Sequence, residues 1–183
     1  MANYHTPTVI QPTILDVDMT PLERLLLSHI FSAEPDGDGL YFYADECPAD
    51  MIWINRSELK TALAASKAAD SDANASIAEQ LSEASTDEDE IELDLSMTSW
   101  EFLFKNIVKR SPTLRYITAV SAFTCSRMRP DGWGGMATFI TAEGIKGQST
   151  NDFLEDCLAE IETGTADETH NLSVNNGEHS GGA

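Results

Sequence analysis

Hydrophobic side chains recur along this chain at two spacings, one typical of strands and one typical of helices. Near the middle of the chain, Ile91, Leu93 and Leu95 alternate with Glu92 and Asp94. This period of two residues indicates a strand with one buried face and one open face. We therefore expect the two acids to share the open face of a strand whose aliphatic side chains enter a core.

A period of three to four residues predicts helices, and the two clearest ones follow capping signals. Thr20 with Glu23, and Thr98 with Glu101, can each form a capping box, in which each side chain bonds the backbone N–H of the other residue. A broad apolar stripe follows each pair, as in a helix with one buried face. We expect helices to begin at these two positions, and Pro112 to end the second.

Short apolar runs bounded by turn residues predict a set of strands. Pro130, Asp131 and Gly132 separate two of these runs and form a turn sequence, because proline presets φ and glycine accepts a positive φ. The resulting expectation is an α+β fold, a single mostly antiparallel sheet of about four to five strands with helices packed on it. The expected strands are residues 40–43, 51–54, 91–95, about 114–128 and about 135–142, and further helices are expected after Asn55 and from residue 149 or 150 to 163.

Three segments lack the pattern of a long helix or strand. Residues 1–18, with prolines and short β-forming pairs, are expected to be an extended N-terminal segment. Residues 64–88 are rich in Ala, Ser, Asp and Glu, and are expected to be a mobile acidic linker with a marginal helix. Residues 164–183 are expected to be a disordered tail. This leaves a single α+β domain over residues 19–163.

The distribution of charge changes this picture more than any motif does. The chain has 31 acidic and 11 basic residues, a net charge of −20. Residues 1–100 hold 20 acids and 4 bases, residues 101–150 hold 3 acids and 7 bases, and residues 151–183 hold 8 acids and no base. We call residues 101–150 the basic block, and two interpretations of it stay open. Its Lys and Arg side chains pair with the surrounding acids, or they form a second, smaller contact site.

A chain this acidic is expected to bind basic surfaces. Phosphates repel it, so direct binding of nucleic acid through a broad basic face is not expected, whereas Lys- and Arg-rich sites of other proteins attract it. We expect a non-enzymatic protein that binds a basic or nucleic-acid-binding partner, in one form an inhibitor that mimics DNA, as anti-restriction and anti-CRISPR proteins do. The candidate contact residues are Asp87, Glu88, Asp89, Glu90, Glu92 and Asp94.

An alternative function uses the predicted hairpin. Trp133 lies among glycines at its tip, close to Arg127 and Arg129, and this combination is typical of an interface anchor. The ring could equally fold back over the sheet, and both interpretations stay open. In this alternative the chain is a small accessory domain of the plasmid or phage type. It binds a protein or a small ligand through the sheet and the hairpin, and the acids only keep it soluble.

No motif in the sequence indicates a catalytic, metal or cofactor site, and none is expected. Asp36-Gly37-Asp38 opens like a calcium loop, but its twelfth position is Cys47 rather than Glu. Residues 144–150 have the ingredients of a phosphate loop at the wrong spacing. An enzyme that uses scattered carboxylates is the least favoured of the three functions.

The cysteines and the apolar runs bear on cellular location. Cys47, Cys125 and Cys157 are odd in number and far apart, which favours free thiols in a reducing compartment over a disulfide framework. The first residues lack a basic and apolar leader, and no apolar run approaches about eighteen residues. We therefore expect a cytoplasmic protein without membrane contact.

Overall fold

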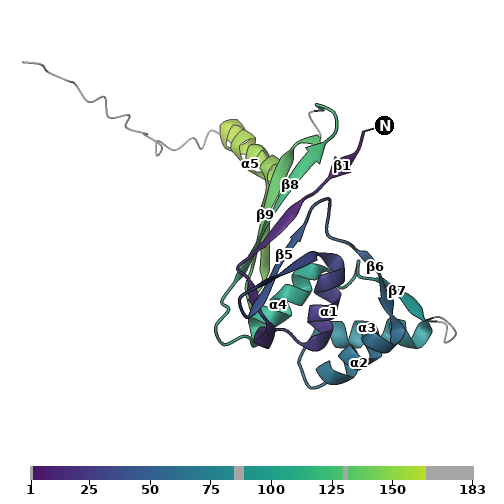
Figure 1. The fold of residues 1–183 in the computed structure, drawn as a ribbon. Helices are drawn as coiled ribbons and strands as arrows, with labels where there is room; N and C mark the ends of the chain where they lie inside the picture. Colours follow the sequence, from purple (N-terminus) through teal and green to yellow (C-terminus); the bar gives the residue numbers. More distant parts are fainter. Residues whose placement is uncertain (1, 85–88, 130–131, 164–183) are drawn as a thin grey trace, which may run out of the picture. The chain divides into compact units, whose positions relative to one another are not determined.

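The computed structural model describes residues 2–84, 89–129 and 132–163 (Figure 1). The chain divides into two units, Met1–Thr150 and Asn151–Ala183, and each unit is described by itself. Within the described residues, the first unit holds two antiparallel sheets and four α-helices, and the second unit is a single helix. None of the described helices is long and apolar enough to cross a membrane.

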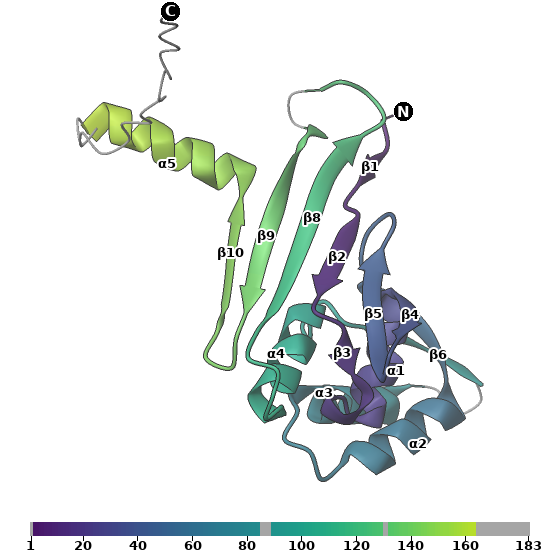
Figure 2. The same cartoon turned by 60° about the vertical axis from the view of Figure 1, so that its left-hand side comes forward.

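The larger sheet has eight strands. They are β1 (Tyr4–His5), β2 (Thr8–Gln11), β3 (Ile14–Leu15), β4 (Ser32–Asp36), β5 (Gly39–Ala44), β8 (Ile117–Cys125), β9 (Gly134–Ile140) and β10 (Ile145–Ser149). The strand order is β10-β9-β8-β2-β5-β3, with β1 also paired to β8 and β4 to β5, and every pair is antiparallel (Figure 2). The smaller sheet pairs β6 (Met51–Asn55) with β7 (Glu90–Asp94).

The helices begin where the sequence supplies caps. They are α1 (Pro21–Ile30), α2 (Arg56–Ser66), α3 (Asp72–Glu83), α4 (Trp100–Arg110) and α5 (Thr150–Thr163), with a short 3-10 turn, η1 (Asp16–Asp18), ahead of α1. The predicted capping box of α1 is confirmed, because Thr20 and Glu23 each accept the other's backbone N–H. Asn55 caps α2 by accepting from the N–H groups of Ser57 and Glu58.

The predicted capping box of α4 is wrong. The N-cap is Ser99 rather than Thr98, and no side chain caps the helix. The backbone N–H of Thr98 donates to the carbonyl of Leu95 (3.0 Å), so Thr98 belongs to the turn that precedes the helix. Glu101 then stands at the second helical position instead of the third, where it cannot complete the box.

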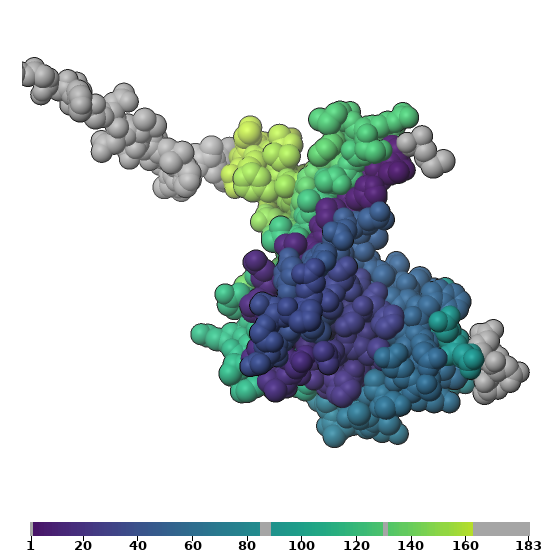
Figure 3. Space-filling model, viewed as in Figure 1, coloured from purple at the N-terminus to yellow at the C-terminus, as the bar shows by residue number. Residues whose placement is uncertain are grey.

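The core packs the inner face of the larger sheet against α1 and α4, and it includes the buried residues of α2, α3, β6 and β7. An aromatic cluster forms part of it. The ring centroid of Phe31 lies 5.6 Å from that of Trp100 and 6.0 Å from that of Phe104, and Phe42 lies 6.0 Å from Phe104. Tilted and edge-on ring pairs of this kind add about 0.5–1.5 kcal/mol each beyond their area burial. Figure 3 shows the outer surface of the molecule from the same side as Figure 1.

The α+β class and the mostly antiparallel sheet are confirmed, but the expected strand number is wrong. The larger sheet has eight strands rather than four to five, and β6 and β7 form a sheet of their own. Two of the unpredicted strands, β1 and β3, are two residues long, too short to show a period. The exposed strand β4 contains Pro35, which is typical of sheet edges, and β10 carries polar residues and a glycine.

Two segments expected to lie outside the core contribute to it. Within residues 1–18, β2 lies at the centre of the sheet between β8 and β5, and Ile10 is 1% exposed. Within residues 64–88, α3 forms and buries Ala73 and Ile77. Residues 85–88 and the predicted tail, residues 164–183, lie outside the described residues.

The expected limits of the α+β domain, residues 19–163, stay predictions.

A buried carboxylate joins three parts of the first unit. The side chain of Glu23 is fully buried and accepts hydrogen bonds from the Thr20 N–H (3.0 Å), the Ser71 hydroxyl (2.9 Å) and the Arg110 guanidinium. Arg110, at the end of α4, also donates to the carbonyl of Asp70 (3.1 Å). This network connects the start of α1, the turn between α2 and α3, and the end of α4.

Neutralising this carboxylate should destabilise the fold strongly. Glu23→Gln keeps the size of the side chain and its capping role but leaves the mostly buried guanidinium of Arg110 without its counter-charge, which typically costs about 3–5 kcal/mol. Urea unfolding measures this loss. The control is Asp16→Asn, which removes one partner of the exposed Arg24–Asp16 pair (3.3 Å) and should cost at most about 1 kcal/mol. Equal losses in the two variants would show that the buried pair stabilises the fold no more than the exposed pair does.

Candidate interaction surfaces

The smaller sheet brings most of the predicted acidic residues onto one surface. Its two strands pair in the register Met51 with Asp94, Trp53 with Glu92, and Asn55 with Glu90, so these side chains project from the same face. All six residues are exposed. We call them, together with the adjoining Asp89, the acidic ribbon. Asp87 and Glu88 lie outside the described residues.

The opposite face of the same two strands is buried. Ile52, Ile54, Ile91 and Leu93 are at most 3% exposed and belong to the same core cluster as the buried residues of α2 and α3. The alternation seen in the sequence therefore corresponds to a half-buried strand. It also fixes which face the acids occupy, because a shift of one residue would put them in the core.

The ribbon has an aromatic centre that the sequence did not reveal. Trp53 is 57% exposed and Met51 is 45% exposed. Trp53 borders a shallow hollow of about 550 Å³ that is also lined by Asn55, Asp89 and Glu90. Because the residues 51–54 are all apolar, their sequence shows no alternation. Only the pairing with β7 shows that Trp53 faces solvent.

Hydrogen bonds hold the ribbon against α3. The side-chain amide of Gln80 donates to the carbonyl of Asp94 and accepts from its N–H, each at 2.9 Å. The carboxylate of Asp94 in turn accepts from the N–H of Ser96 (2.9 Å). Bonds from the side chain and the backbone of Ser96 hold the pKa of Asp94 below its usual range, because they stabilise the ionised carboxylate.

The loop between β8 and β9 carries the predicted hairpin residues. Trp133 is 46% exposed, so its ring is partly covered and partly open. Arg127 and Arg129 are exposed, and Arg129 donates to the hydroxyl of Tyr4 (3.2 Å). Gly132 packs so closely that a Cβ there would lie 2.5 Å from the Cβ of Cys125, which explains the glycine next to Trp133.

The outer face of the larger sheet, which the alternative function invokes, is rich in apolar side chains. Two aromatic pairs stack on it, with ring centroids 5.5 Å and 5.2 Å apart. Between them Val9 and Val120 pair directly across β2 and β8. The hydroxyl of Tyr43 donates to Glu34 (2.8 Å), and this bond raises the pKa of Tyr43. The side chains that form this outer face are Val9, Tyr41, Tyr43, Tyr116, Val120 and Phe139.

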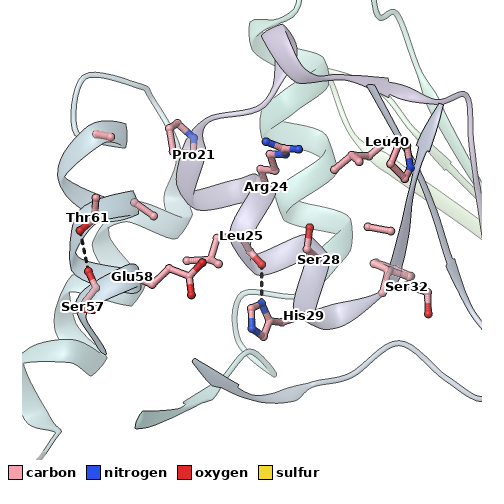
Figure 4. Close-up of a pocket in the computed structure, with 15 residues that line it drawn as sticks. Pro21, Arg24, Leu25, Ser28, His29, Ser32, Leu40, Ser57, Glu58 and Thr61 are labelled. Carbon is pink, nitrogen blue, oxygen red and sulfur yellow. Dashed lines mark hydrogen bonds between the residues drawn. The ribbon is translucent and has the colours of Figure 1, made fainter. Parts of the chain in front are cut away.

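A groove of about 950 Å³ lies between α1, α2 and β4 (Figure 4). The side chains of Leu25 and Leu40 are among its apolar lining. Two of its polar side chains make contacts within their own helices: the ring Nδ1 of His29 lies 3.0 Å from the carbonyl of Leu25, and the hydroxyl of Thr61 donates to the carbonyl of Ser57 (2.8 Å). Within the described ranges, no three His, Cys, Asp or Glu side chains gather as a metal site would require.

Two bases of the basic block pair with acids from the first hundred residues. Lys109 lies 2.9 Å from Asp70, and Arg110 binds Glu23. The hydrogen bond between Lys109 and Asp70 lowers the pKa of the acid and raises the pKa of the base. For these two side chains the structure favours pairing over a separate contact site.

Comparisons with family models, curated proteins and solved structures return no match to this chain.

Removing the amide of Gln80 should loosen the ribbon without unfolding the protein. Gln80→Ala deletes both bonds to the backbone of Asp94. Each lost hydrogen bond costs about 1 kcal/mol, about 2 kcal/mol in total, so the Asp94 amide should exchange its hydrogen about thirtyfold faster. Amide exchange followed by NMR measures this change. Glu79→Ala, on the adjacent exposed position of α3, is the control. Unchanged exchange at Asp94 in the Gln80 variant would show that α3 does not hold β7.

Proposed function

We propose that this protein is a non-enzymatic interaction protein whose acidic ribbon binds a basic surface of a partner protein. One observation carries this proposal: Trp53 is exposed at the centre of a ribbon whose charged residues are all acids. Strands β6 and β7 contain no Lys or Arg. Their buried faces and the bonds from Gln80 hold the acids in a fixed arrangement.

The chemistry of the ribbon suits arginine above other side chains. A guanidinium can stack on the indole of Trp53, an interaction of about 0.5–2 kcal/mol, while its N–H groups donate to a neighbouring carboxylate such as Glu92. Exposed aromatic residues are common among the residues that dominate binding energy. The surrounding carboxylates speed association and make it weaken with salt.

Charge density bears on whether the ribbon imitates DNA. Alternate carboxylates along β7 stand about 7 Å apart, whereas a duplex carries one charge per about 1.7 Å of its axis. The ribbon alone is therefore too sparse to replace a duplex. In its finer form, we propose an inhibitor of the anti-restriction or anti-CRISPR type that occupies a nucleic-acid-binding site. Such an inhibitor needs acids of this chain beyond those of the ribbon, and the net charge of the chain, −20, supports this form.

A cytoplasmic location is part of the same proposal. Cys47, Cys125 and Cys157 are free thiols, and Cys47 is exposed. Exposed free thiols persist in reducing compartments.

Binding to a labelled hexa-arginine peptide tests the ribbon directly. Glu92→Gln with Asp94→Asn removes two charges, and exposed charge pairs contribute up to about 1 kcal/mol each, so fluorescence polarisation at low ionic strength should show about tenfold weaker binding. Trp53→Ala should weaken binding as well. The control, Glu79→Gln with Glu83→Gln, removes two exposed charges from α3 and should change binding less than twofold. Equal weakening by both double variants would mean that only net charge matters.

The outer face of the larger sheet supports a second candidate function. It carries two exposed valines, one exposed aromatic pair (Tyr116 and Phe139) and one half-buried pair (Tyr41 and Tyr43). These side chains favour binding of a protein or a small ligand through the sheet, with the hairpin of Trp133 as a further contact. Contiguous apolar side chains at a surface mark interaction sites more often than single ones do.

One substitution separates the two candidates. Val120 is 54% exposed, so Val120→Asp should fold normally while placing a charge at the centre of the outer face. The measurement is recovery of partner proteins from a lysate of the source organism at low salt, with elution by a salt step. If the ribbon is the binding surface, the Val120 variant recovers the same proteins as the wild type and the ribbon double variant loses them. The reverse outcome would favour the sheet.

A further inference from the structure

The helix α5 carries an exposed apolar stripe. Phe153, Leu154, Leu158 and Ile161 are 58%, 57%, 59% and 73% exposed. At 100° per residue these positions fall within an arc of about 140° on one side of the helix. Cys157 lies within the same arc and is half-buried. Over its 14 residues the helix is about 21 Å long, so the stripe is a continuous ridge rather than a set of scattered side chains.

Acids border the stripe along both edges. The same angular positions put Glu155 and Glu162 beside one edge, and Asp156 and Glu160 beside the other. With Asp152, the helix has five acids and no base. The structure assigns the helix to the second unit, and its apolar face is exposed.

These two borders decide which surface could cover the stripe. Two copies of α5 packed along their stripes would bring acidic borders together, and like charges at such flanking positions destabilise paired helices. An anionic bilayer would also repel the helix, because membrane-surface helices carry Lys and Arg on their polar face. A protein groove with an apolar floor and basic rims satisfies both the apolar ridge and its borders.

We propose that α5 is a docking helix that inserts Phe153, Leu154, Leu158 and Ile161 into an apolar groove of a partner protein whose two rims carry Lys or Arg. This inference uses residues that are separate from the acidic ribbon and does not rest on the function proposed above. A groove that binds a helix contacts anchor side chains three to four residues apart. Here the acidic borders of the stripe also require positive charge on both rims of the partner's groove.

Site-specific photo-crosslinking in the full-length protein tests this. A benzophenone amino acid at position 153 replaces one aromatic side chain with another, and the protein is irradiated in a lysate of the source organism. We expect an adduct whose crosslinked segment on the partner is apolar and has Lys or Arg near it in the partner's structure. Leu154→Ser with Leu158→Ser should reduce the adduct at least tenfold. Glu155→Gln with Glu162→Gln should reduce it several-fold and weaken its dependence on salt.

The control is Ala159→Ser, which places the same polar group on the opposite side of α5 and should leave the adduct unchanged. Circular dichroism of each variant checks that the helix persists. The inference is overturned if the adduct joins two copies of this chain, forms within one chain, or maps to an acidic or uncharged groove. Failure of the adduct to form, or persistence of the adduct after both leucines are replaced, would also contradict the proposal. So would stoichiometric binding of the helix to anionic phospholipid vesicles.

Discussion

The fold depends on the charge of one buried residue. The carboxylate of Glu23 is removed from water and stabilised by Arg110, by the hydroxyl of Ser71 and by the N–H of Thr20. An unpaired charge in that position would cost several kcal/mol, so the start of α1, the turn before α3 and the end of α4 must come together. Once they do, α4 is held against α1, and Phe104 completes the aromatic cluster.

The buried pair of Glu23 and Arg110 also helps to hold the surface that we propose binds a partner. Ser71 is the N-cap residue of α3, and Gln80 of α3 fixes the backbone of Asp94 in β7. The acidic ribbon is therefore anchored through α3 to the buried ion pair. A surface that is ordered before binding loses less conformational entropy when a partner arrives, which suits a small ribbon with a single aromatic anchor.

The sequence predicts helix caps and strand faces, which depend on residues close together in the chain. It does not predict the ion pair or the strand pairings, which join residues that are far apart in the chain. The alternation around Leu93 indicated which face Glu92 occupies, and the capping box of Glu23 was visible three residues from Thr20. Nothing local indicated that Arg110 binds Glu23, since 87 residues separate them. The sequence did not indicate that Trp53 is exposed, because its neighbours are also apolar. The strands β1 and β3 are too short to be recognised from the sequence, since only their pairing with longer strands defines them.

We propose that a basic partner binds the acidic ribbon rather than the negative charge of the chain as a whole. Backbone amide shifts of the ¹⁵N-labelled protein, followed while hexa-arginine is added, distinguish these two modes of binding. We expect the shifts to concentrate at residues 51–55 and 89–95 and to include the indole N–H of Trp53, while the exposed acids of α3 stay unchanged. Shifts spread evenly over all acidic segments would contradict this proposal.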